Sequence, residues 1–216
     1  MNNKERVLDR ASNTPTQNCA SLYVGRFAPS PSGPLHFGSL VCALASFLHA
    51  KQHHGKWLVR IEDVDTPRIE AGMVDSILTS LIAHGLIWDD KVTFQSKRSS
   101  HYQEYLDKLQ KAQLLYGCAC TRQQIRARSK TYDGYCRKLG LSYENRAIRF
   151  VHTNDNSKFI DLRSGPCFIE HEIAKEDPVL KRADGIYAYH LAVVADDIEQ
   201  KVTHIVRGID LLETTP

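Results

Sequence analysis

The apolar positions of the first half of the chain fall into short runs that alternate with longer, helix-like segments. Two β-branched and aromatic runs, SLYVGRF at 21–27 and KWLVRIE at 56–62, predict buried strands. The first is followed by the apolar segment GSLVCALASFLHAKQ at 38–52, which predicts a helix. A strand, a loop, a helix and a second strand in this order predict the opening of a doubly wound α/β sheet.

Two further segments show the periodicity of amphipathic helices. In RIEAGMVDSILTSLIAHGL, residues 68–86, apolar side chains recur on one stripe, formed by Met73, Val74, Ile77, Leu78, Leu81 and Ile82. The segment RSSHYQEYLDKLQKAQLL, residues 98–115, predicts a third helix with Ser99 or Ser100 as its cap.

The pattern changes after residue 115, and this change suggests the domain organisation. Residues 116–138 contain few aliphatic side chains and three cysteines, and the β-like runs AIRFV, KFIDL and CFIEHE follow. The segment GIYAYHLAVVADDI at 185–198 is interpreted as a strand that returns to the main sheet. We therefore expect a flexible tail at 1–20, the first half of a catalytic domain at 21–115, an inserted module at 116–184 and the start of its second half at 185–216.

Composition and charge exclude several classes of protein. Hydrophobic residues make up 42% of the 216 residues and charged residues 25%, which suits a globular protein with a sizeable core. The net charge of +3 permits a polyanionic partner without requiring one. The polar N-terminus does not resemble a signal peptide, and no apolar run is long enough to span a membrane, so we expect a cytoplasmic protein. Its six cysteines are then expected to be thiols or metal ligands.

The stretch PSGPLHFGS at 31–39 stands directly before the first predicted helix. Its small residues would let a ligand approach the backbone, the helix start offers free N–H groups, and His36 adds a side-chain donor, so the loop could bind phosphates. The same composition also suits a simple turn in which Ser39 caps the helix. The residues alone leave both interpretations open.

The context of this loop resembles a known family. RFAPSPSGPLHFGS followed by LVRIEDVDTPR is similar to class I aminoacyl-tRNA synthetases of the glutamyl subgroup, and the resemblance covers residues 21–216. His36, Phe37, Gly38 and Ser39 match the HIGH motif of that class, with departures at Phe37 and Ser39. The resemblance implies a Rossmann-like catalytic domain with a parallel sheet and an inserted zinc-containing module. It also implies that His36, Gly38 and Ser39 hold the phosphates of ATP.

Charged residues at predicted strand ends would suit an amino-acid substrate. Glutamate needs an acidic residue for its ammonium group and cations for its two carboxylates, and Arg26, Glu62, Tyr189 and Arg207 could converge at one crevice. By resemblance, the glutamate-binding residues are Arg26, Phe27, Ala28, Pro29, Ser30, Glu62, Tyr189 and Arg207. Taken singly, these side chains could equally form a surface ion pair, a core aromatic and a solvated charge.

Three cysteines lie close together in the sequence. Cys118, Cys120 and Cys136 suggest a tetrahedral zinc site, although three reduced structural thiols would give the same pattern. The fourth ligand stays open on chemical grounds, since Tyr132, Asp133, Tyr135 and His101 all carry suitable atoms. The resemblance implies Tyr132, because the pattern Cys-x-Cys…Tyr-x-x-x-Cys of the family matches Cys118, Cys120, Tyr132 and Cys136. With four protein ligands the zinc would be structural.

Two branches of the family compete. One comprises full glutamyl-tRNA synthetases, and the other comprises shorter glutamyl-queuosine tRNA(Asp) synthetases, which lack an anticodon-binding domain. The short link from Cys120 to YDGYC, the stretch YAYHLAVVADD and the Leu-Leu of RGIDLLETTP resemble the shorter branch. This branch implies a ligase that activates glutamate with ATP and Mg²⁺ without tRNA and transfers it to the queuosine base in the tRNA(Asp) anticodon. We expect it to act as a monomer without a membrane partner.

One family feature is not found in the 216 residues. The second ATP motif, which is KMSKS-like and contains a lysine, would follow some tens of residues after ETTP. Either the chain is a fragment of a longer protein or it has lost this motif, so we expect the activity of the intact protein rather than of this chain alone. The alternatives are a fragment of a full glutamyl-tRNA synthetase and a non-catalytic nucleotide- or RNA-binding remnant.

Overall fold

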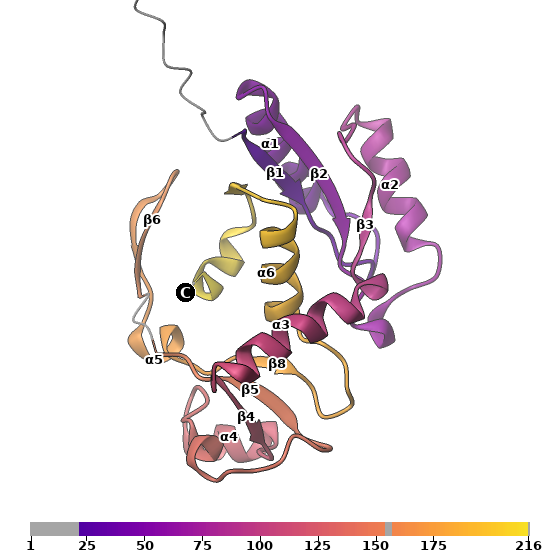
Figure 1. The fold of residues 1–216 in the computed structure, drawn as a ribbon. Coiled ribbons are helices and arrows are strands. Elements are labelled where there is room, and N and C mark those ends of the chain that lie inside the picture. Colours follow the sequence, from indigo (N-terminus) through magenta and orange to yellow (C-terminus); the bar gives the residue numbers. More distant parts are fainter. Residues whose placement is uncertain (1–21, 154–156, 216) are drawn as a thin grey trace, which may run out of the picture.

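The computed structural model describes residues 22–153 and 157–215, and its first layer is a parallel sheet of four strands (Figure 1). The strand order is β3 (Thr93–Phe94), β2 (Lys56–Ile61), β1 (Val24–Phe27) and β9 (His204–Ile205). All three pairings are parallel, and Arg26 of β1 lies opposite Leu58 on one side and Ile205 on the other. The predicted parallel α/β sheet is confirmed. The predicted tail at 1–20 lies outside the described residues.

Helices α1 (Phe37–Gln52) and α2 (Met73–Ala83) pack on one face of this sheet. Trp57, Val59 and Ile61 alternate toward this face, where Ile77 and Leu81 of α2 are fully buried. In α1 the small residues Ala43, Ser46 and Ala50 face the sheet, which lets the helix approach it closely. The hydroxyl of Ser46 accepts from Trp57 Nε1 at 3.0 Å and donates to the carbonyl of Arg26 at 3.1 Å.

Helix α6 (Tyr189–Glu199) lies on the other face, where Asp197 contacts Arg26 and Arg60, and α3 (Ser99–Lys111) packs against α6. The prediction of a strand at 185–198 is therefore wrong. Leu191, Ala192 and Ala195 recur with helical spacing and are buried, whereas the β-branched Val194 that favoured a strand is 57% exposed. The predicted serine cap of α3 is also wrong, because Arg98 occupies the N-cap position.

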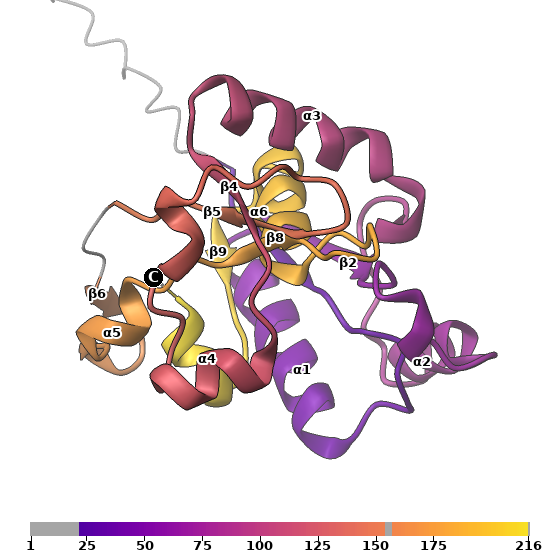
Figure 2. The same cartoon turned by 90° about the horizontal axis from the view of Figure 1, so that it is seen from below.

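A second, antiparallel sheet is built from the middle of the chain. Its strand order is β4 (Leu115–Cys118), β5 (Ala147–Phe150) and β8 (Val179–Lys181), and α4 (Arg122–Arg128) follows β4. In Figure 1, α3 and α6 lie between the two sheets, and Figure 2, seen from below, shows β4 and α4 at the front of the molecule. Apolar side chains of α3 and α6 pack with Leu180 of β8 in one cluster.

The remaining elements are short. The strands β6 (Lys158–Asp161) and β7 (Gly165–Phe168) form a hairpin, so KFIDL is confirmed as a strand, whereas CFIEHE continues after Phe168 into helix α5 (His171–Ala174). Single 3₁₀ turns are η1 (Thr66–Arg68), η2 (Gln95–Lys97), η3 (Tyr135–Lys138) and η4 (Ile209–Thr214). Among the described residues, no helix combines the length and apolar character that crossing a bilayer requires.

Candidate active site and metal centre

An open cleft of about 1120 Å³ lies between the carboxyl end of the parallel sheet and the antiparallel sheet. Ser30 and Glu62 line it where β1 and β2 have ended, and Tyr189 and His190 line it from the start of α6. Arg149 of β5 and Arg122 of α4 lie on the opposite wall. Crevices at the carboxyl ends of parallel strands are the usual ligand sites of open α/β sheets, so this cleft is the candidate active site.

The four charged or polar residues expected to bind glutamate come from four different parts of the chain. Arg26 lies in β1, Glu62 directly follows β2, Tyr189 is the first residue of α6, and Arg207 follows β9. Burial raises the pKa of the Tyr189 phenol, the charge of Glu62 raises it further, and the cations Arg26 and Arg207 lower it. The tertiary structure therefore brings Arg26, Glu62 and Arg207 within electrostatic reach of Tyr189. Glu62 and Tyr189 line the cleft, whereas Arg26 and Arg207 are not among its lining residues. Tyr189 occupies a helix start rather than the strand end that the sequence suggested.

Two residues that the sequence analysis did not single out, the buried Arg60 and the partly exposed Asp197, hold this group together. Arg60 is fully buried and donates from Nη1 to Asp197 Oδ1 at 2.7 Å and from Nη2 to Glu62 Oε1 at 3.3 Å. Asp197 also accepts from Arg26, with Nε–Oδ1 at 3.4 Å and Nη2–Oδ2 at 3.5 Å. A signal for them existed. Arg60 and Arg26 share a sheet face by strand alternation, and the two aspartates directly follow Ala195, the last buried apolar position of α6.

Glu62 is a buried carboxyl group with an altered acidity. Its residue is 8% exposed, and burial raises its pKa from 4.5 to about 7, although Arg60 and Arg26 partly offset this effect. An additional cation in the cleft would favour the ionised form of this carboxyl group. The side chain can therefore respond to a bound ammonium group by losing its proton.

The stretch 26–30 contributes backbone and side chains in different ways. Phe27 packs in the core against Trp57, so this residue can offer a ligand only its backbone. Pro29 is buried and its carbonyl accepts from Glu62 N–H at 3.0 Å, which ties the stretch to the end of β2. Ala28 is half-buried, and Ser30 is exposed and lines the cleft.

The HFGS segment forms the start of α1. His36 is the N-cap, and its Nδ1 accepts from Ser39 N–H at 3.2 Å while its Nε2 lies 3.1 Å from Ser39 Oγ. The cap is therefore His36, and the alternative in which Ser39 caps the helix is wrong. A Cβ at Gly38 would lie 3.1 Å from the His36 ring, so the ring would have to shift slightly to admit any other residue there. His36, Gly38 and Ser39 do not line the described cleft, whereas Ser30, Pro31 and Ser32 of the preceding loop do.

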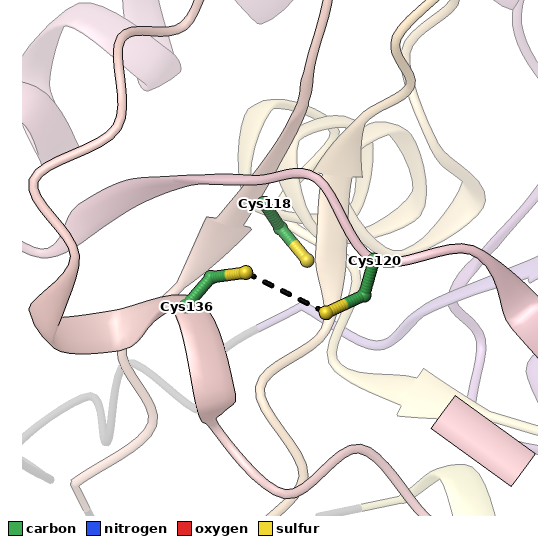
Figure 3. A group of neighbouring side chains, drawn as sticks. All are labelled: Cys118, Cys120 and Cys136. Atoms are coloured by element: carbon green, nitrogen blue, oxygen red, sulfur yellow. Dashed lines mark hydrogen bonds between the residues drawn. The ribbon is translucent and has the colours of Figure 1, made fainter. Parts of the chain in front are cut away.

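The three clustered cysteines meet in space, as Figure 3 shows. The Sγ atoms of Cys118, Cys120 and Cys136 all lie within 4.8 Å of one another, and Cys120 Sγ and Cys136 Sγ are 3.5 Å apart. Thiolates around a tetrahedral Zn²⁺ lie about 3.8 Å apart, given Zn–S bonds of about 2.3 Å. This cluster therefore fits a metal ion, and it is the one such group among the described residues.

Tyr132 is the suggested fourth ligand that lies at this cluster. Its hydroxyl is 3.5 Å from Cys118 Sγ and accepts from Cys136 N–H at 2.9 Å. Asp133 is ion-paired with Arg128 at 2.7 Å, Tyr135 is 59% exposed, and His101 packs in α3 against Tyr105. Burial raises the pKa of the Tyr132 phenol, so a cation would be needed for tyrosinate to form.

The other described cysteines are separate from this group. All five cysteines in the described part of the chain are free thiols, as expected. Cys42 is only half-buried rather than part of the core, and Cys167 lies in the β6–β7 hairpin. Cys19 lies outside the described residues.

Comparison with known proteins gives consistent matches. The family model for the catalytic domain of class I tRNA synthetases (E and Q) matches residues 23–216. The glutamyl-Q tRNA(Asp) synthetase of Idiomarina loihiensis is 56% identical over 191 residues, which cover 88% of this chain and 68% of that protein. The protein of the same name from Photobacterium profundum is 51% identical over 193 residues, with coverages of 89% and 62%.

A solved structure matches in fold. The crystal structure of glutamate-tRNA synthetase from Elizabethkingia anophelis superposes with a TM-score of 0.77 at 29% identity, over 90% of this chain and 46% of that chain. The chain thus spans about two thirds of the length of the curated relatives it matches, and less than half of this structural relative.

Proposed function

We propose that this chain, which belongs to the class I tRNA synthetase family (E and Q, catalytic domain), forms the glutamate-activating part of a ligase. The observation that carries the proposal is that Glu62 and Tyr189 line one cleft and that Arg26 and Arg207 lie close enough to act on the Tyr189 phenol. This set supplies an acidic group for the ammonium of an amino acid and two guanidinium groups for its carboxylates.

Activation of glutamate needs alignment more than covalent chemistry by the protein. An oxygen of the α-carboxylate attacks the α-phosphorus of ATP, the new O–P bond gives glutamyl-adenylate, and the bond to the bridging oxygen breaks so that pyrophosphate leaves. We assign His36 and the N–H groups around Gly38 and Ser39 to the phosphates, where they would offset negative charge. Bound Mg²⁺ would neutralise phosphate oxygens.

For the second step we propose queuosine in the anticodon of tRNA(Asp) as the acceptor. A hydroxyl of its cyclopentenediol attacks the acyl carbonyl, the new ester bond forms and AMP leaves. The names of the curated relatives support this assignment, and the arginines Arg122 and Arg182 along the cleft suit an anionic RNA.

We further propose that Cys118, Cys120, Tyr132 and Cys136 hold a structural Zn²⁺. The three thiols come from the end of β4 and from the turn η3. The guanidinium carbon of Arg149 lies 3.7 Å from the centre of the Tyr132 ring. A zinc ion there would brace the antiparallel sheet that forms one wall of the cleft.

The test is glutamate-dependent ATP–pyrophosphate exchange without tRNA, measured on this chain and on a longer natural version. His36→Asn is expected to abolish exchange while retaining a side-chain acceptor at the N-cap. His54→Asn is the matched control, because His54 is exposed in the turn after α1. Binding of ATP or tRNA without exchange in either version would instead support a non-catalytic binding module.

The acceptor is tested separately, with the longer version. Transfer of labelled glutamate to queuosine-containing tRNA(Asp), and not to tRNA(Asp) lacking queuosine or to tRNA(Glu), is the expected result. Transfer to tRNA(Glu) would identify the protein as part of a full glutamyl-tRNA synthetase.

A further inference from the structure

We propose that Asp197 is a positioning residue, which occupies the guanidinium groups of Arg60 and Arg26 and thereby leaves the Glu62 carboxylate available for the ammonium group of the substrate. The inference deepens the proposed function and rests on it for the identity of the substrate. Asp197 lies in α6 and need not touch the amino acid itself.

The geometry shows a competition between two carboxylates for the same cations. Arg60 donates to Asp197 at 2.7 Å but reaches Glu62 only at 3.3 Å. Arg26 makes two contacts with Asp197, at 3.4 and 3.5 Å. Asp197 therefore accepts the shorter hydrogen bond from Arg60 and both contacts from Arg26. Glu62 accepts one longer hydrogen bond, from Arg60.

The surroundings make this competition consequential. Arg60 is fully buried and Glu62 nearly so, and water therefore screens their interaction weakly. The groups that act on Glu62 come from β1, β2 and α6, and they are Arg26, Arg60, Asp197 and Tyr189. A carboxylate with one long contact to an arginine, as Glu62 has at 3.3 Å, gains more from an incoming cation than a closely paired carboxylate does.

Asp196 and Asp197 are adjacent and both lie near Arg60, whose Nε is 3.8 Å from Asp196 Oδ2, but their closer partners differ. Asp196 is fully buried and accepts from Gln95 at 2.9 Å, Arg98 at 2.6 Å and Tyr102 at 2.8 Å, so it fastens α6 to α3 and η2. Asp197 is partly exposed and points to the arginines at the cleft. The first aspartate thus supports the fold, and the second bears on the site.

The test is to follow the ionisation of Glu62 by ¹³C NMR of the side-chain carboxyl group in ligand-free protein. The signal is assigned by its loss in Glu62→Gln. In Asp197→Asn the two arginines lose this anionic partner, although Asp196 stays 3.8 Å from Arg60 Nε. Their charge then acts more strongly on Glu62, so its titration midpoint is expected to fall by about 1 to 3 pH units. Asp90→Asn is the control: Asp90 pairs at the surface with Lys56, at the opposite end of β2, and should leave the midpoint unchanged.

A merely structural role for Asp197 would lower stability without moving this midpoint downward, so an unchanged or raised midpoint overturns the proposal. If Asp197→Asn does not fold, Arg26→Gln serves instead. It removes a cation that stabilises the Glu62 carboxylate, and the midpoint should rise. A fall or no change would overturn the proposal in that variant.

Glutamate titrations by calorimetry at pH 6 and pH 8 then separate the inference from the proposed function. The wild-type protein should bind glutamate about ten-fold more tightly at pH 8, and Asp197→Asn should show a ratio of about two or less, with weaker binding at pH 8. No binding by the wild-type protein would overturn the proposed substrate, whereas the NMR midpoints still decide the role of Asp197. A ten-fold ratio retained in Asp197→Asn would overturn the inference alone.

Discussion

The buried Glu62 carboxyl group predicts an unusual dependence of stability on pH. The folded protein holds its proton up to a pKa of about 7, whereas the unfolded chain releases it near 4.5. Between these values the folded state binds more protons, so this group stabilises the protein at low pH and the contribution is lost as pH rises. Over pH 5 to 8 the loss amounts to about 2 to 3 kcal/mol in the free energy of unfolding.

The perturbation that isolates this contribution is Glu62→Gln. Urea unfolding of the wild type and the variant is followed by tryptophan fluorescence at pH 5, 6, 7 and 8, since Trp57 is fully buried. Burial lowers the pKa of His190 and of His204, which makes both histidines favour stability at higher pH, but these contributions cancel in the difference between the two proteins. As pH rises, the free energy of unfolding of the variant should increase relative to that of the wild type. A difference that is constant from pH 5 to 8 would refute the reasoning.

Three other predictions concern the metal site, the core and substrate binding. Cys136→Ser should abolish binding of one equivalent of zinc by atomic absorption, whereas Cys167→Ser should retain it; equal zinc content would contradict the proposed site. Leu81→Ala should lower the free energy of unfolding by about 2 to 5 kcal/mol, while Ile82→Ala, at a position 55% exposed, should cost far less; similar losses would place Leu81 outside the core. Glutamate binding should weaken about ten-fold from pH 8 to pH 6 and become independent of pH in Glu62→Gln, and a sloping profile in that variant would assign the titration to another group.

Local pattern was sufficient for most of the parallel layer. The runs that predicted β1, β2, α2 and α3 contain these elements, and the run for α1 begins one residue late, at Gly38. In α2 and α3 the buried residues lie on the apolar stripe, whereas α1 buries small residues and leaves Leu44 and Leu48 exposed. The pattern failed for α6, where β-branched residues at 193 and 194 suggested a strand. Packing of Leu191, Ala192 and Ala195 against α3 and β8 outweighed that local preference.

The sequence by itself determined the chemistry of the candidate site, since the residue types and their order around PSGPLHFGS and LVRIED point to one family. Strand alternation even places Arg26 and Arg60 on one face of the sheet. Only the tertiary structure decided how their charges are shared. Asp197 lies 171 positions beyond Arg26 and meets it because α6 packs across the sheet, and Glu62 holds its proton because this packing removes it from water. Burial and long-range ion pairing depend on the whole fold, and no local pattern encodes them.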